Sequence, residues 1–298
     1  MWLLFGFCSA VLLGLYDINK KISVQNNAVI PVLFLSIVIS SVLLSPFLLL
    51  SRLSPDCLDG TVVFVPQVDM RTHFLIFLKS LIVLTSWIFS YFGLKHLPIT
   101  LASPVAATRP AWTVVGALLI FGEDLNLYQL IGIVIALSSF FLFSIAGKKE
   151  GISFATNKWF WFLVLATLTG AISGLYDKYL MRQFDHMAVQ VYYTFYQALI
   201  MSAVTLLLWF PKRKETTPFQ FRWSIVLISV FLISSDFFYF YALTFPDALI
   251  SVLSIVRRFG VVVSFSYGVI VLRDKNVKSK AFCLLGVLAG MIFLFLGS

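Results

Sequence analysis

Three arginines stand near the middle of long apolar segments, where a charge is costly. Arg109 lies at the centre of a segment over 99–121. Arg257 and Arg258 lie close to the middle of another, over 248–272. An arginine at the centre of a bilayer costs on the order of 3 kcal/mol on insertion scales, so it belongs in a bundle interior or a water-filled cavity. Because guanidinium is a planar fork that matches carboxylate or phosphate, the pattern predicts a buried site for an anionic group.

Acidic residues are fewer at the same depth. Asp236 lies near the middle of its segment, whereas Asp17 and Asp177 lie nearer the ends of theirs. If Asp236 neutralises one arginine, two positive charges stay near the midplane, and an anionic substrate is the simplest compensation. The alternative is an ion pair that only fixes helix register. The three aspartates are also candidates for proton coupling, with permanent ionisation beside a lysine or arginine as the alternative.

Polar and aromatic side chains at helical spacing accompany these charges, and together they form two predicted sets. The predicted substrate-binding residues are Arg109, Arg257, Arg258, Asp236, Tyr239, Tyr196, Gln197, Ser254 and Thr113. The predicted coupling or gating residues are Asp17, Asp177, Tyr16 and Tyr176. The chain has neither a His-Glu-x-x-His nor a Gly-x-Ser-x-Gly motif, so we expect no metal site, no cofactor and no catalytic residue.

The composition is that of a membrane protein. Of the 298 residues, 60% are hydrophobic and only 12% are charged, about half the charge of a soluble domain. The net charge of +9 comes from residues at segment ends, which does not favour nucleic acid as a partner. We expect an all-α integral membrane protein with ten transmembrane helices. They are predicted at 2–21, 28–50, 73–95, 99–121, 126–146, 159–181, 187–210, 223–244, 248–272 and 279–297.

The chain also repeats itself. The tetrapeptide Gly-Leu-Tyr-Asp at 14–17 recurs at 174–177. Small residues at every fourth position, a pattern that lets membrane helices approach closely, precede both copies: Gly6, Ala10, Gly14 and Ala166, Gly170, Gly174. Arg109 aligns with Arg257 in the later helices of each half. We therefore predict two five-helix repeats, at 1–150 and 151–298. Because five is odd, the second enters the bilayer inverted, and a central cavity lies between the two.

Several of these features resemble the EamA-type drug/metabolite transporters. They are the two five-helix halves, Pro110 in the fourth helix, and Gly122-Glu123 shortly after it. In the second half, Arg258 replaces the corresponding proline, and Leu272-Arg273-Asp274 replaces the Gly-Glu turn. The resemblance implies ten helices around a central cavity and the movement of small metabolites. With the arginines, it leads us to expect a secondary transporter that moves a small carboxylated or amino-acid-like metabolite by alternating access.

Other functions stay open at this point. A proton-coupled exporter of cationic or aromatic drugs would use Asp17, Asp177 and Asp236 as binding carboxylates. A non-transporting scaffold would not need central arginines. An intramembrane aspartyl protease would need a Gly-x-Gly-Asp setting, which Asp236 lacks. The expected partners are therefore a small anionic or zwitterionic substrate, protons and the lipid bilayer, with a monomer expected and a dimer as the alternative.

The orientation in the membrane has two conflicting indications. Most of the 22 Lys and Arg residues fall in the odd-numbered loops, which the positive-inside rule places in the cytoplasm. This distribution predicts both termini outside, whereas the family resemblance implies both termini inside. The lack of long terminal tails favours a bacterial inner membrane.

Overall fold

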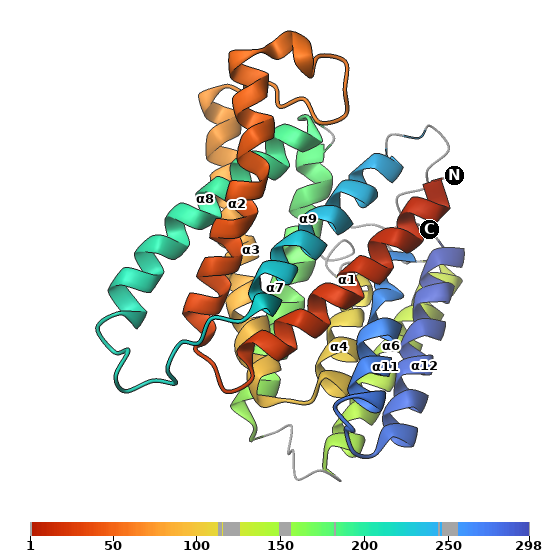
Figure 1. Ribbon diagram of the computed structural model, residues 1–298. Helices are drawn as coiled ribbons and strands as arrows, with labels where there is room; N and C mark the ends of the chain where they lie inside the picture. The colour runs from red at the N-terminus through yellow and green to blue at the C-terminus, as the bar shows by residue number, and fades with distance from the viewer. Residues whose placement is uncertain are drawn as a thin grey trace.

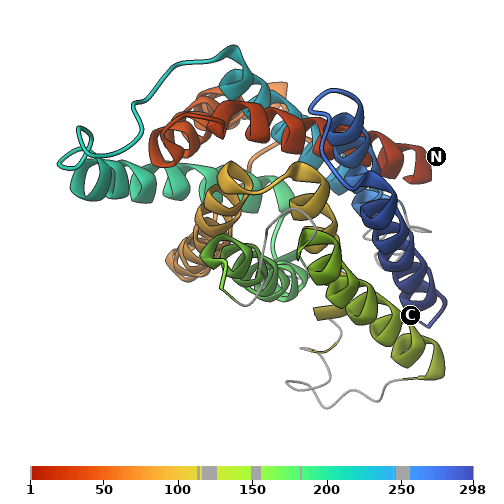
Figure 2. The ribbon, with the colours of Figure 1, turned by 90° about the horizontal axis from the view of Figure 1, so that it is seen from below.

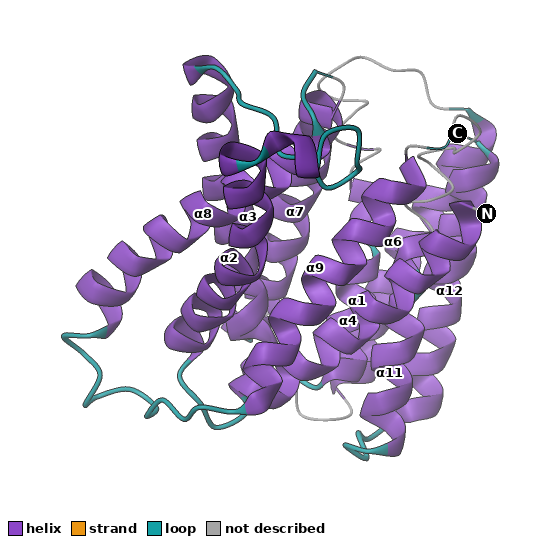
Figure 3. Ribbon diagram, turned by 45° about the horizontal axis from the view of Figure 1, so that its top comes forward, coloured by secondary structure: helices purple, strands orange, loops and turns teal. Residues whose placement is uncertain are grey.

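The computed structural model describes residues 2–112, 115, 126–148, 156–181, 183–243, 245 and 256–297. All regular secondary structure within these ranges is helical (Figure 3), which confirms the predicted all-α class for this part of the chain. The helices are α1 (Trp2–Val24), α2 (Val29–Leu53), α3 (Met70–His96), α4 (Ile99–Ala107), α6 (Leu127–Lys148), α7 (Lys158–Met181), α8 (His186–Val204), α9 (Trp223–Leu243), α11 (Gly260–Ile270) and α12 (Val277–Leu296). A short 3-10 turn (Pro55–Cys57) follows α2, and a π turn (Thr205–Trp209) continues α8.

Six of these helices are long and apolar enough to cross a membrane by length and composition. They are α1, α2, α3, α7, α8 with its π turn, and α12. The protein is therefore a multi-pass integral membrane protein. Each of the ten predicted segments holds helical residues within the described ranges, while the count of ten spans stays a prediction.

The helices pack in pairs that are distant in sequence. α1 packs on α9, α3 on α7, α2 on α8, and α6 on α12. α4 contacts both α7 and α11, and α11 also contacts α1. α6 and α12 lie on the side of the molecule opposite α8 (Figures 1 and 2), so α1, α4, α7 and α9 fill the region between.

Glycine allows two of these helix pairs to touch along their backbones. A Cβ atom at Gly14 would lie 2.6 Å from the carbonyl oxygen of Gly260, and one at Gly260 would lie 2.4 Å from the oxygen of Ala10. Gly132 and Gly290 meet in the same way between α6 and α12. The small-residue pattern of the first repeat thus marks a close helix crossing, as predicted. In the second repeat the pattern has another use, described below.

The predicted segment over 99–121 is not one continuous helix. α4 ends at Ala107, Thr108 forms a turn, and the chain is helical again over 109–112. Pro110 explains the break, because proline has no backbone N–H and its ring disfavours helix at the preceding residue. Proline is tolerated in the first turn of the new helix, because an N–H at that position has no partner within the helix. Arg109 therefore stands beside a backbone break and not in the middle of a straight helix.

A similar helix break follows Arg257 and Arg258. Residues 256–258 are helical, Phe259 forms a turn, and α11 begins at Gly260. All three arginines of the predicted site thus lie within a few residues of a helix interruption.

Candidate functional site

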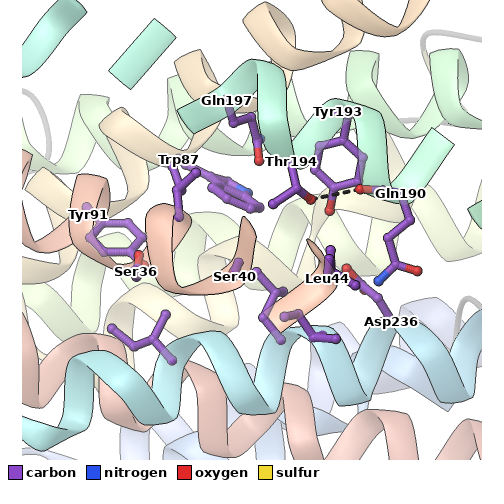
Figure 4. A pocket seen from close by; sticks show the side chains of 14 residues that line it. Ser36, Ser40, Leu44, Trp87, Tyr91, Gln190, Tyr193, Thr194, Gln197 and Asp236 are labelled. Atoms are coloured by element: carbon purple, nitrogen blue, oxygen red, sulfur yellow. Dashed lines mark hydrogen bonds between the residues drawn. The ribbon is translucent and has the colours of Figure 1, made fainter. Parts of the chain in front are cut away.

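A polar pocket lies between α2, α3, α8 and α9 (Figure 4). Its aromatic wall consists of Trp87, Tyr91 and Tyr193. The remaining lining residues are Ser36, Ile37, Ser40, Leu44, Gln190, Thr194, Gln197, Ile228, Leu232, Ile233 and Asp236. The pocket therefore combines aromatic faces with hydroxyl, amide and carboxylate groups, in a part of the molecule where most side chains are apolar.

Three of the polar groups on the pocket wall come from one face of α8. This helix starts after Asp185, whose carboxylate accepts hydrogen bonds from the backbone N–H groups of Met187 and Ala188 at 2.8 and 3.0 Å. From that start, Gln190, Thr194 and Gln197 follow at spacings of four and three residues and so share a face. The cap fixes where α8 begins, and packing against α2 and α3 turns this face toward the pocket.

Gln197 is the most informative of these residues. Its side chain is buried, with 1% of the residue exposed, and its amide nitrogen has no hydrogen-bond partner within the described part of the chain. By contrast, the Thr194 hydroxyl donates to the Gln190 carbonyl oxygen at 2.8 Å. A buried donor without a partner costs about 1–3 kcal/mol, so a bound group that accepts its hydrogen bond would recover that cost.

Asp236 joins the pocket to the arginines. Its carboxylate accepts a hydrogen bond from Nη2 of Arg257. The Cζ atom of Arg257 also lies 4.4 Å from the ring centroid of Tyr239, within cation–π distance. The structure therefore brings together three predicted binding residues at the end of the pocket that Asp236 forms.

Arg109 lies against α7. A Cβ atom at Gly170 would lie 2.5 Å from Cζ of Arg109, so the absence of a side chain at this position makes room for the guanidinium. The small-residue pattern of the second repeat thus accommodates an arginine and not a helix backbone. At Gly174 a Cβ atom would meet nothing within 4 Å among the described residues.

The three arginines lie close enough to act on one another electrostatically. Arg109 experiences the charges of Arg257 and Asp17, and Arg258 experiences those of Arg109 and Arg257. The Nε atoms of Arg257 and Arg258 are buried and lack a hydrogen-bond partner among the described residues. The three guanidinium groups thus interact electrostatically, and Asp236 already binds that of Arg257.

The remaining predicted residues are placed differently. Asp17 forms an ion pair with Lys20 at 2.9 Å, and Asp177 forms one with Lys79. The hydroxyl of Tyr176 donates to the Leu75 carbonyl oxygen at 3.1 Å. Tyr16 packs with its ring centroid 4.8 Å from Nζ of Lys20.

Tyr196 is not among the residues that line the pocket. Its hydroxyl lies 3.0 Å from Nδ1 of His73 on α3. Neither residue lines the pocket. Its neighbour Gln197 does line the pocket. Thr113 and Ser254 lie outside the described residues.

Several pocket residues were not predicted. Ser36, Ser40, Trp87, Tyr91 and Gln190 line the pocket together with Tyr193 and Thr194. One signal in the sequence could have indicated some of them, namely the spacing of Gln190, Thr194 and Gln197 on a single helix face. The serines and Trp87 carry no such signal, because serine is common within apolar membrane helices.

Packed apolar helices around a small pocket with polar side chains in its wall define a multi-pass helical membrane protein. Residues 1–145 match the EamA-like transporter family, which confirms the resemblance seen in the sequence. Comparison with curated proteins found no match. The family indicates a membrane transporter of small molecules, and its members are transporters and not enzymes.

Proposed function

We propose that this protein is a secondary transporter that moves a small carboxylated or amino-acid-like metabolite through the pocket between α2, α3, α8 and α9. The observation that carries the proposal is the position of Gln197. This residue places a buried amide nitrogen without a partner on the same pocket wall as the Asp236 carboxylate, which is bound to Arg257. The Gln197 amide can donate a hydrogen bond to the ligand, and the Asp236–Arg257 pair can bind a charged group. Such a site suits a ligand that has both a hydrogen-bond acceptor and a charge.

The chemistry of the pocket supports a zwitterion. A substrate carboxylate would accept from the Gln197 amide and compete with Asp236 for the guanidinium of Arg257, with Arg258 and Arg109 adding positive potential. A substrate ammonium group would replace Arg257 as the partner of Asp236. Trp87, Tyr91 and Tyr193 would contact the apolar part of the ligand.

We propose an inverted repeat as the basis of alternating access, and the helix contacts support it. If α1, α2, α3, α4 and α6 are exchanged with α7, α8, α9, α11 and α12, the contact α1–α9 becomes α7–α3, and α1–α11 becomes α7–α4. The pairs α2–α8, α4–α11 and α6–α12 map onto themselves. A pseudo-two-fold relation of this kind lets the two halves exchange conformations, so that the pocket opens to each side in turn.

For the energy source we favour exchange or facilitated movement over proton coupling. Asp17, Asp177 and Asp236 each form an ion pair with a lysine or an arginine, so none of the three is an unpaired carboxylate. Uptake into proteoliposomes should therefore be unaffected by an imposed pH gradient. A rate that rises with the gradient would establish proton coupling and overturn this part of the proposal.

A second candidate is export of cationic or aromatic compounds. It is favoured by the aromatic wall beside Asp236, since aromatic faces and a carboxylate bind organic cations. The two candidates differ in the charge of the ligand, so the same experiment separates them.

The test is ligand-dependent thermal stabilisation of the purified protein. We would compare L-amino acids with matched compounds that lack one charge, such as phenylalanine, 3-phenylpropionate and phenethylamine, with corresponding trios for aliphatic side chains. The zwitterions, or the acids, should raise the melting temperature, and the Gln197→Leu variant should lose most of that shift. Stabilisation by the amines alone would support the cationic alternative and overturn the anionic one.

For the location we propose a bacterial inner membrane, with both termini outside as the distribution of lysine and arginine predicts. Labelling of a single cysteine placed at the carboxyl terminus in intact cells, with a membrane-impermeant maleimide, tests the orientation. Labelling only after cell lysis would place the termini inside.

A further inference from the structure

The aspartate of each Gly-Leu-Tyr-Asp motif holds a lysine against a tyrosine of the pocket wall. In the second motif, Asp177 on α7 forms an ion pair with Lys79 on α3. Nζ of Lys79 lies 4.9 Å from the ring centroid of Tyr193, which lines the pocket from α8. The side chain of Lys79 is only 6% exposed, so its charge is shielded from water and interacts more strongly with the ring.

The first motif is arranged in a corresponding way, although its lysine comes from a different place. Asp17 pairs with Lys20 on the same helix, at 2.9 Å. Nζ of Lys20 lies 5.3 Å from the ring centroid of Tyr91, which lines the pocket from α3, and 4.8 Å from that of Tyr16. The lysine side chain is 8% exposed.

The two tyrosines lie at opposite ends of the pocket. In the close-up, Tyr91 stands at one end beside Ser36, Tyr193 stands at the other above Asp236, and Ser40 lies between them (Figure 4). The repeated motif therefore places one cation against the aromatic ring at each end of the pocket.

We propose that Lys20 and Lys79 are positioning residues, which fix Tyr91 and Tyr193 through their rings and set the preference of the pocket for negatively charged groups. The proposal rests on the proposed function only in taking this pocket as the substrate site. A cation over an aromatic face attracts the ring, and this attraction favours one ring orientation. The ion pairs with the aspartates hold each lysine in place.

The experiment uses a cysteine in the pocket and needs no substrate. Ser40→Cys is introduced after the native Cys8, Cys57 and Cys283 have been replaced. Its reaction rates are measured with an anionic methanethiosulfonate, the ethylsulfonate, and with a cationic one, the ethyltrimethylammonium. The ratio of the two rates reports the electrostatic preference of the pocket. This ratio can be interpreted even if none of the compounds in the thermal-stabilisation test binds.

Lys79→Met should lower the anion-to-cation ratio by about threefold or more, because it removes the cation that holds the Tyr193 ring and with it a positive charge beside the pocket. Lys79→Arg should keep the ratio within about twofold of the parent. Lys158→Met is the matched control, since Lys158 lies 4.7 Å from the Trp159 ring centroid in a cation–π pair whose residues do not line the pocket. That variant should leave the ratio unchanged.

Two further variants separate positioning through the ring from a simple ion pair. Exchanging the charges, Lys79→Asp with Asp177→Lys, keeps the pair but removes the cation from the Tyr193 ring, so the ratio should fall as in Lys79→Met. In a Tyr193→Leu background, Lys79→Met should have less than half its former effect. A parent-like ratio in the exchanged variant, or an undiminished effect without the ring, would overturn the proposal. If Lys79→Met does not yield a monodisperse protein, Lys79→Gln with Asp177→Asn takes its place under the same criteria.

Discussion

Asp236 and Arg257 form an ion pair in which the carboxylate lines the polar pocket and the guanidinium lies behind it, against Tyr239. The side chains are 13% and 18% exposed, so both charges are largely removed from solvent. In the proposed function this pair has two roles, because it joins α9 to the segment before α11 and its charges would meet the ligand.

The first prediction concerns the two roles of this pair. Asp236→Asn or Arg257→Gln alone should destabilise the protein by about 3 kcal/mol, because each leaves a buried charge without its partner. The double variant should recover most of that loss, as measured by chemical or thermal unfolding in detergent. It should not recover ligand-induced stabilisation. A double variant that responds to ligands like the parent would show that the pair is structural only.

The second prediction compares two glycines on the same helix. Gly170→Ala should destabilise the protein by about 1–3 kcal/mol, because the new methyl group would lie 2.5 Å from Cζ of Arg109. Gly174→Ala should stabilise α7 by roughly 0.5–1 kcal/mol, since its methyl group would meet nothing within 4 Å among the described residues. Melting temperatures measured side by side test the contrast. Equal effects at both positions would contradict the observed contact.

The third prediction addresses the crossing of α1 and α11. Gly260→Ala should reduce the yield of folded protein more than Gly170→Ala does. Its Cβ atom would lie 2.4 Å from the backbone oxygen of Ala10, which cannot move aside as a flexible side chain can. Size-exclusion chromatography of the purified variants gives the measurement. A monodisperse Gly260→Ala protein with parental stability would rule out the close crossing.

The fourth prediction concerns Gln197. Replacing this residue with leucine removes a buried amide whose nitrogen has no partner, so the protein without ligand should be as stable as the parent or more stable, by up to about 1 kcal/mol. The same change should weaken ligand binding by about tenfold, the effect of one lost hydrogen bond to a charged group. Ser202→Ala is the control, because its hydroxyl already donates to the Ala198 carbonyl oxygen on α8 and lies outside the pocket lining. It should leave binding unchanged.

Part of the site could be predicted from the depth of charges in apolar segments. Asp236, Arg257 and Tyr239 were expected at one site, and the structure brings them together. The reason is general, because a charge deep in a membrane helix must turn inward and find a partner. Depth alone could not identify the partners of Asp17 and Asp177, which are lysines nearer to the helix ends.

Neighbouring residues on a helix show where such prediction fails. Tyr196 and Gln197 were both expected to bind substrate, but Tyr196 meets His73 while Gln197 lines the pocket. Successive side chains point about 100° apart around a helix, so only one of two neighbours can face a given cavity. Trp87 and Ser36 were missed for the same reason, since nothing in their local sequence indicates which way they face.

The sequence by itself determined that the chain is helical and membrane-embedded, and that its arginines must lie inside the bundle, because hydropathy and segment length are local properties. It also determined the break beside Arg109, since proline acts on its immediate neighbours. Only the tertiary structure decided that Gly170 accommodates a guanidinium while Gly14 meets a helix backbone, and that two lysines lie against the tyrosines of the pocket. Lipid is as apolar as the helix surfaces it surrounds, so hydrophobicity does not select which faces meet, and that choice depends on the detailed fit of side chains from distant helices.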